Sequence, residues 1–253
     1  MSVTLPTPGS KAAPLLIARR AVREVRRTIH HYRNASKIEL LSQFESLGDN
    51  CEFANFQKSA GVDQPGLFKW MDTSVPGLVA TLANELAGVD DIANLELKAA
   101  HDGEYLLHHR LFGSASHTFA RVASDDPGKV LQREHRRLIM LRRKFLEDVH
   151  AARRTYVFRS LRPVTQCEAS SLLAALRRKG PNTLLWVRPA LEPIHVGRVQ
   201  RMNDGLLVAD IDSLATYENG MTWTSQHWLP ILDKARALAA PVPPDRLSGE
   251  TAA

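Results

Sequence analysis

Apolar residues recur at three- and four-residue spacing near the start of the chain, with arginines between them. This spacing predicts a basic amphipathic helix over residues 14–35. Its apolar face comprises Leu15, Ala18, Val22, Val25 and Ile29. Residues 14–32 either dock on the protein body or make a peripheral contact with an acidic membrane. Docking is favoured, because the apolar face lacks the Trp and Phe residues that anchor interfacial helices.

Beyond this helix the periodicity alternates between helical and extended segments. A short helix follows residue 51, and another begins near Ser74, where Pro76 suits a first turn. Helices are also predicted over residues 130–150, 166–179 and 226–238. Extended segments are predicted at 95–97, 105–110, 117–122, 155–159, 184–187 and 205–211, the second and third forming a hairpin. The mixture indicates an α+β or α/β fold.

The two ends differ in composition from the rest of the 253-residue chain. Residues 1–13 are rich in Pro, Ser, Thr and Ala, and residues 240–253 have a similar composition, so both ends are predicted to be disordered. A single folded domain is therefore expected over residues 36–239, which is long enough to bury a substantial core.

The formal net charge of +6 could favour nucleic acid as a partner. The excess basic residues, however, gather in segments predicted to be helical, such as residues 19–27 and 133–143, where they usually form a solvated face. No nucleic-acid motif accompanies them, so nucleic acid is not an expected partner. Without an export segment or an apolar run of membrane-spanning length, a cytoplasmic location is expected.

The two cysteines occupy equivalent local patterns and are expected to be free thiols. Asp49-x-x-Glu52 fits a capping box, which would place Cys51 at the second helical position. Free backbone amides and the helix dipole stabilise a thiolate there, and the amides of Cys51 and Asn50, at the helix N-terminus that begins with Asp49, could bind an oxyanion. Thr165-x-x-Glu168 places Cys167 in the same way, so this geometry does not choose between them. For each cysteine, a small buried side chain is the alternative.

The residues around Cys51 do distinguish the two cysteines. The run Ser46-Leu47-Gly48-Asp49-Asn50-Cys51-Glu52-Phe53-Ala54 is followed by Gly61 and by Leu67-Phe68-Lys69-Trp70. This stretch resembles the opening signature of a bacterial domain family of unknown function described as papain-like cysteine peptidases. The resemblance extends over about residues 42–235, but only the first 30 or so are specific.

The resemblance implies a papain-like cysteine-hydrolase architecture, in which a helix bearing Cys51 packs on a sheet that carries the histidine base. That histidine maps onto His117, and the substrate would be an acyl compound or a peptide. Where many family members have an acidic residue, this chain has Lys69. Asp72 is close enough in sequence to serve as an imperfect substitute.

A third polar residue would orient the imidazole, and Asp210 or Asp212 on the last predicted strand is the candidate. No cofactor is expected, because the chain lacks a glycine-rich phosphate loop. No metal site is expected either, since adjacent histidines such as His108 and His109 point in different directions. The alternatives to an enzyme are an inactive binding module of the same fold and a protein associated with a membrane surface or polysaccharide.

Overall fold

A computed structural model describes residues 35–215 and 225–239. The chain divides into two compact units, residues 1–39 and residues 40–253. In the first unit, residues 35–39 are described and are helical. The rest of the helix predicted over 14–35, and the ends predicted to be disordered, lie outside the described residues. All elements below belong to the second unit.

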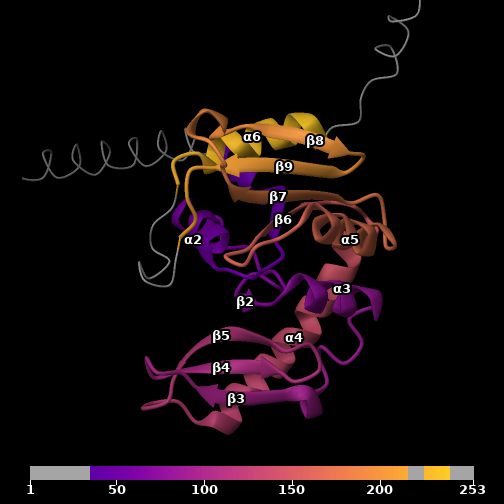
Figure 1. The fold of residues 1–253 in the computed structure, drawn as a ribbon. Helices are drawn as coiled ribbons and strands as arrows, with labels where there is room; N and C mark the ends of the chain where they lie inside the picture. The colour runs from indigo at the N-terminus through magenta and orange to yellow at the C-terminus, as the bar shows by residue number, and fades with distance from the viewer. Residues whose placement is uncertain (1–34, 216–224, 240–253) are drawn as a thin grey trace, which may run out of the picture. The chain divides into compact units, whose positions relative to one another are not determined.

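A mixed five-stranded sheet forms one part of this unit (Figure 1). Three of its neighbouring pairs are parallel and one, at the edge, is antiparallel. In spatial order its strands are β1 (Phe44–Ser46), β6 (Thr155–Arg159), β7 (Thr183–Pro189), β9 (Leu206–Ile211) and β8 (Val199–Asn203). The central strands read as nearly continuous apolar runs because both faces of the sheet are covered.

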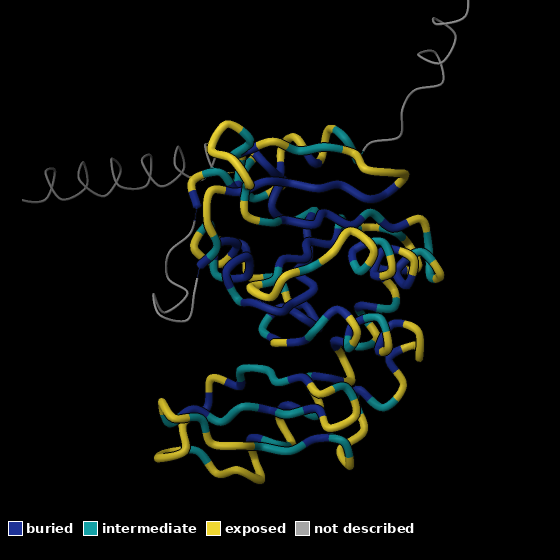
Figure 2. The backbone as a smooth tube through the Cα atoms, viewed as in Figure 1, coloured by how far each residue is buried: buried dark blue, intermediate teal, exposed yellow. Residues whose placement is uncertain are grey.

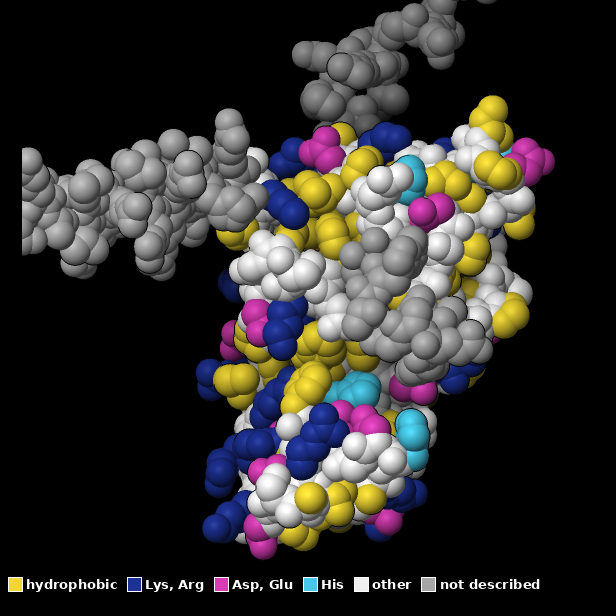
Figure 3. Space-filling model, turned by 90° about the vertical axis from the view of Figure 1, so that its left-hand side faces the viewer, with side chains coloured by type: hydrophobic (Ala, Val, Ile, Leu, Met, Phe, Trp, Pro, Cys, Tyr) yellow, Lys and Arg dark blue, Asp and Glu magenta, His cyan; other side chains and the backbone are white. Residues whose placement is uncertain are grey.

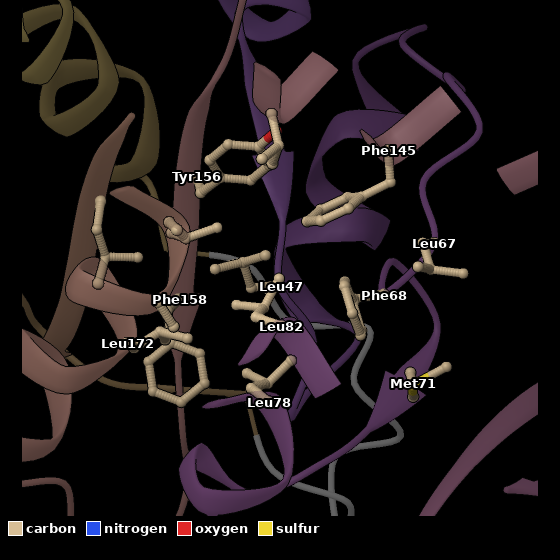
Figure 4. Packing of buried hydrophobic residues seen from close by; sticks show 14 of the residues in the cluster. Leu47, Leu67, Phe68, Met71, Leu78, Leu82, Phe145, Tyr156, Phe158 and Leu172 are labelled. Atoms are coloured by element: carbon tan, nitrogen blue, oxygen red, sulfur yellow. The ribbon is translucent and has the colours of Figure 1, made fainter. Parts of the chain in front are cut away.

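Alternate residues of these strands pack on opposite faces. Tyr156 and Phe158 of β6 join a cluster with α3 (Val75–Ala83) and α5 (Gln166–Arg177) (Figure 4). On the other face, α6 (Trp228–Ala239) packs against β8 and β9. Each fully buried side chain of this kind contributes roughly 1.5–3 kcal/mol to folding. This double layer holds β1, and hence the residues that follow it, in a fixed place.

The second sheet is antiparallel and has four strands. In order these are β2 (Met71–Asp72), β5 (Ser114–Arg121), β4 (Glu104–His109) and β3 (Leu95–Ala99), with the 3-10 turn η1 (Ile92–Asn94) leading into β3. The long helix α4 (Pro127–His150) packs on it through β3 and β5. Along its strands, buried residues are interspersed with partly buried and exposed ones. The residues of the five-stranded sheet, in contrast, are mostly buried (Figure 2).

The predicted elements are largely confirmed, and the fold is α+β with both a mixed and an antiparallel sheet. The hairpin, the helix capped by Ser74 and the strand at 155–159 all form where the pattern placed them. Strand β8 and the turn η2 (Pro193–His195) were not predicted, because their polar sequences carry no apolar alternation. No helix among the described residues has the length and apolar character needed to cross a membrane.

One expected arrangement needs correction. His117 was expected on the sheet against which the cysteine-bearing helix packs. Instead, α2 (Glu52–Ser59), which follows Cys51, is bonded to β1 and β6 of the mixed sheet, whereas His117 lies on β5 of the antiparallel sheet. Cys51 therefore lies between a strand of the mixed sheet and α2, whereas His117 lies on the antiparallel sheet of the same compact unit.

Candidate functional site

A tight turn after β1 delivers Cys51. Gly48 has a φ of +84°, and a Cβ there would lie 2.7 Å from the Met71 carbonyl oxygen. Asp49 also has a positive φ, +66°, and its amide donates a hydrogen bond to the same oxygen at 3.0 Å. Glycine is required for the first position, while aspartate tolerates the second better than most residues do. The turn thus packs against the start of β2.

This turn makes the predicted capping box at Asp49 wrong. Helix α2 begins at Glu52, and Cys51 is its N-cap. The Glu52 amide donates instead to the Asn50 side-chain oxygen, at 2.7 Å. Asp49 cannot cap the helix, because its left-handed backbone turns the chain and its carboxylate pairs with Arg162. The corresponding box at Thr165 and Glu168 is confirmed, with both of its hydrogen bonds present.

Glu52 has a different structural role from the predicted one. Its carboxylate is fully buried and lies 2.6 Å from the Arg159 guanidinium on β6. It also accepts hydrogen bonds from the indole N–H of Trp228 at 2.9 Å and from the Ala215 amide at 3.0 Å. A buried charge requires such partners. Glu52 therefore ties the start of α2, directly after Cys51, to β6 and α6.

Cys51 and His117 line the same cavity, which has a volume of about 280 Å³. The turn after β1 supplies one wall and the antiparallel sheet supplies the other. Four carboxylates also line the cavity, those of Asp49, Asp72, Asp102 and Glu104. On the face drawn in Figure 3, histidine and acidic side chains lie next to each other.

The imidazole of His117 is held by Glu104. Its Nδ1 lies 3.1 Å and 3.2 Å from the two carboxylate oxygens of that residue, which is buried. The backbone amide of His117 donates to the Trp70 carbonyl oxygen at 3.1 Å. With Nδ1 engaged by Glu104, Nε2 is the ring nitrogen left for chemistry.

Asp210 and Asp212 do not occupy the place predicted for a third residue. The Asp210 carboxylate lies 2.9 Å from the Arg188 guanidinium, and that of Asp212 lies 4.0 Å from the imidazole of His227. Neither residue lines the cavity. The residue that contacts the His117 imidazole is Glu104, and so the prediction of Asp210 is corrected to Glu104.

The environment of the cavity disfavours the thiolate form that was predicted for Cys51. Burial, and then the negative charges of Asp72 and Glu104, raise the pKa of the Cys51 thiol to about 11. Arg159 acts in the opposite direction but is outweighed. Burial and the neighbouring Asp49 also raise the pKa of Asp72, although Arg162 lowers it. The resting site therefore holds a protonated thiol, because the helix dipole does not overcome burial and carboxylates.

Lys69, the residue that departs from the family pattern, points elsewhere. Its ammonium lies 2.7 Å from the Asp63 carboxylate and donates to the Gln64 carbonyl oxygen. It does not line the Cys51 cavity, whereas Asp72 does. Arg162 binds the carboxylates of both Asp49 and Asp72. An acidic group is thus present in the cavity despite the lysine.

Among residues 35–215 and 225–239, no group of three or more His, Cys, Asp and Glu side chains is arranged to hold a metal ion. Cys167 is exposed on α5, so of the two thiols only that of Cys51 shares a cavity with a histidine.

Sequence reasoning missed Glu104 and Arg162. Glu104 lies thirteen residues before His117, and a hairpin register that pairs the two strands is the signal that could have indicated it. Arg162 follows strand β6 at its carboxyl end, where functional residues of such sheets gather.

Comparison with known protein families, curated proteins and solved structures finds no match to this chain.

Proposed function

We propose that the protein is a cysteine hydrolase or acyltransferase of papain-like architecture, acting on an amide, ester or thioester. The observation that carries the proposal is the shared cavity of Cys51 and His117, with Glu104 on the imidazole Nδ1. A nucleophile, a base and a residue that orients the base are the parts that acyl transfer through a thiol requires.

In the first half of the reaction, the Nε2 of His117 accepts the thiol proton while the Cys51 sulfur attacks the acyl carbon. The carbonyl π electrons move to oxygen, and the tetrahedral intermediate collapses as the imidazolium gives its proton to the leaving group. A thioester on Cys51 remains. In the second half, water or another nucleophile loses a proton to His117 and attacks the thioester, which releases the acyl product and restores the thiol.

The raised thiol pKa decides how the proton moves. A thiol with a pKa of about 11 does not form a resting ion pair with an imidazole. Proton transfer must therefore accompany the attack, which makes His117 a general base during the step. Glu104 supports this role, because a carboxylate beside Nδ1 stabilises the imidazolium that forms.

Backbone groups at the start of α2 supply the candidate oxyanion site. Within the described residues, the Cys51 amide donates to no other group. The amide of Asp49, the residue predicted to cap the helix, is already bonded to the Met71 carbonyl oxygen. The Cys51 amide is therefore the better candidate for binding a developing negative charge.

Steady-state hydrolysis of p-nitrophenyl acetate tests the proposal. Cys51→Ala and His117→Ala should each lower kcat/KM by about 10²-fold or more, and Glu104→Gln by about 10²-fold. Asp210→Asn, a carboxylate bonded outside the cavity, and Cys167→Ser are matched controls that should retain the wild-type rate. Equal rates in wild type and Cys51→Ala would contradict the proposal.

A catalytically inactive binding module of the same fold is the second candidate. The observation that favours it is the raised pKa of the Cys51 thiol, which removes the preformed thiolate of an efficient cysteine enzyme. On this alternative, the wild type and all five variants in the hydrolysis assay would react at the same slow rate.

A further inference from the structure

The hairpin of β4 and β5 is irregular beside the candidate base. Glu104 pairs with Arg121 and Leu106 pairs with His117. Strand β5 therefore has three residues, 118–120, where β4 has only Tyr105. Bulges of this kind redirect side chains and are often found next to active sites.

Phe119, at the centre of this bulge, combines two unfavourable features. Its φ is +57°, in the left-handed region that a phenylalanine rarely adopts, and the residue is 58% exposed. Burial of the ring therefore does not account for the backbone conformation. Strained residues persist only where their surroundings fix them, and they cluster at functional sites.

The contacts of Phe119 explain what fixes it. Its backbone amide donates a hydrogen bond of 2.8 Å to Oε1 of Glu104, whose oxygens also hold Nδ1 of His117. Its ring lies nearly parallel to the His117 imidazole, with centroids 5.9 Å apart and planes inclined by 22°. The ring also meets Trp70 edge-on, at 5.3 Å and 89°. Phe119 thus contacts the imidazole directly and the orienting carboxylate through its amide.

We propose that Phe119 is a positioning residue for His117, held in a strained conformation so that its amide fixes Glu104 and its ring fixes the plane of the imidazole. The inference rests on the proposed function in so far as His117 is the base. It goes further by assigning a role to an exposed apolar residue outside the cavity lining. An imidazole restrained on two sides keeps Nε2 in one direction, which preserves the geometry needed for proton transfer.

The test separates positioning from stability by using substitutions that relieve the strain. Phe119→Gly removes both the ring and the steric cost of a positive φ, whereas Phe119→Tyr keeps the ring. Ala152→Gly is the matched control, because Ala152 also has a positive φ, +48°, at the end of α4 and far in sequence from the site. If Phe119→Gly has a lower melting temperature than wild type, Phe119→Asn replaces it in the test. Asparagine also lacks the phenyl ring, and it tolerates a positive φ.

With p-nitrophenyl acetate, Phe119→Gly should lower kcat about tenfold while KM changes less than about twofold. Its melting temperature should equal or exceed that of wild type, and Phe119→Tyr should restore kcat. Ala152→Gly should gain the same stability without a change in kcat. Wild-type kcat in Phe119→Gly and Phe119→Asn would overturn the inference.

A second readout does not depend on turnover. In the NMR spectrum, the Cε1–H signal of His117 should be single and narrow in wild type and in Phe119→Tyr, and shifted or broadened by exchange in Phe119→Gly. An unchanged signal in Phe119→Gly would overturn the positioning role. If Cys51→Ala retains wild-type hydrolysis, the proposed function fails, yet this signal still decides whether Phe119 positions His117.

Discussion

The thiol of Cys51 is surrounded by groups that disfavour its ionisation. It is partly buried at the start of α2, and the carboxylates of Asp72 and Glu104 face the same cavity. Burial and negative charge both stabilise the neutral form of a thiol. A cysteine enzyme built on this site would activate its nucleophile only when the base removes the proton during attack.

Alkylation with iodoacetamide measures this property directly. The rate at Cys51 should rise with pH to a midpoint near 11. Near neutral pH it should be about 10²-fold slower than that of an unperturbed thiol, because thiolate is the reactive species and a free cysteine has a pKa of about 8.5. Cys167, which is exposed, provides an internal comparison when peptides are quantified separately. A Cys51 midpoint below about 8.5 would show that the helix dipole and His117 stabilise the thiolate after all.

At the scale of single elements, strand β4, which pairs with the strand that carries His117, contains a buried histidine. His109 is 2% exposed, and its Nε2 has no hydrogen-bond partner in the described part of the chain. Burial, and to a smaller extent the neighbouring His108, lowers the pKa of His109 to about 4. The antiparallel sheet thus depends on a neutral imidazole.

The sign of the resulting pH dependence follows from proton binding. The unfolded chain binds a proton at His109 below a pKa of about 6.5, whereas the folded protein does so only below about 4. Stability should therefore fall as the pH is lowered from about 6.5 to 4, by about 3 kcal/mol in total. Urea unfolding of His109→Leu should lose most of this decline, while the exposed His150→Gln should keep it. An equal decline in His109→Leu would contradict the assignment.

The elements differ in how well their sequences indicate them. Strand β6 and helix α4 were predicted because apolar periodicity reports burial on one or both faces. The start of α2 was predicted too early in the chain, because Asp49 and Glu52 have the spacing of a capping box. In the structure their carboxylates pair instead with Arg162 and Arg159. Partners from distant segments, such as Arg159 and Arg162, leave no local pattern.

The candidate site was predicted only in part for the same reason. Cys51 and His117 were identified by resemblance to a family, and the fold brings both to one cavity. The residue that contacts the His117 imidazole, Glu104, was not identified. Its position beside His117 depends on the register of a hairpin that contains a bulge. A bulge changes which side chains face each other without altering the apolar alternation on either side.

At the scale of the whole molecule, the local charge of the cavity is opposite to the net charge of the chain. The chain carries a formal charge of +6, yet the cavity is lined by four carboxylates and by no lysine or arginine. Arg162, bonded to Asp49 and Asp72, offsets part of this negative charge. The local field, which acts at the shortest distance, decides which substrates enter.

This field should discriminate among activated esters. Neutral p-nitrophenyl acetate and cationic p-nitrophenyl 4-aminobutyrate should react faster than the anionic p-nitrophenyl hemisuccinate, by about tenfold or more in kcat/KM, because like charges repel in a partly enclosed site. Added salt should reduce the difference, since it screens charges. In Asp72→Asn the discrimination should weaken, whereas Asp233→Asn on α6 should preserve it. Equal rates for the three esters would contradict this account of selectivity.

The central claim is that Cys51, His117 and Glu104 transfer an acyl group together. Rapid acid quenching of Cys167→Ser with p-nitrophenyl acetate, followed by peptide mass spectrometry, measures the acyl group on Cys51. The account predicts an acetyl thioester on Cys51 that forms within the first turnover and accumulates at least about tenfold more slowly in His117→Ala and Glu104→Gln. Absence of acetyl on Cys51, or its equal accumulation in all three proteins, would contradict the claim.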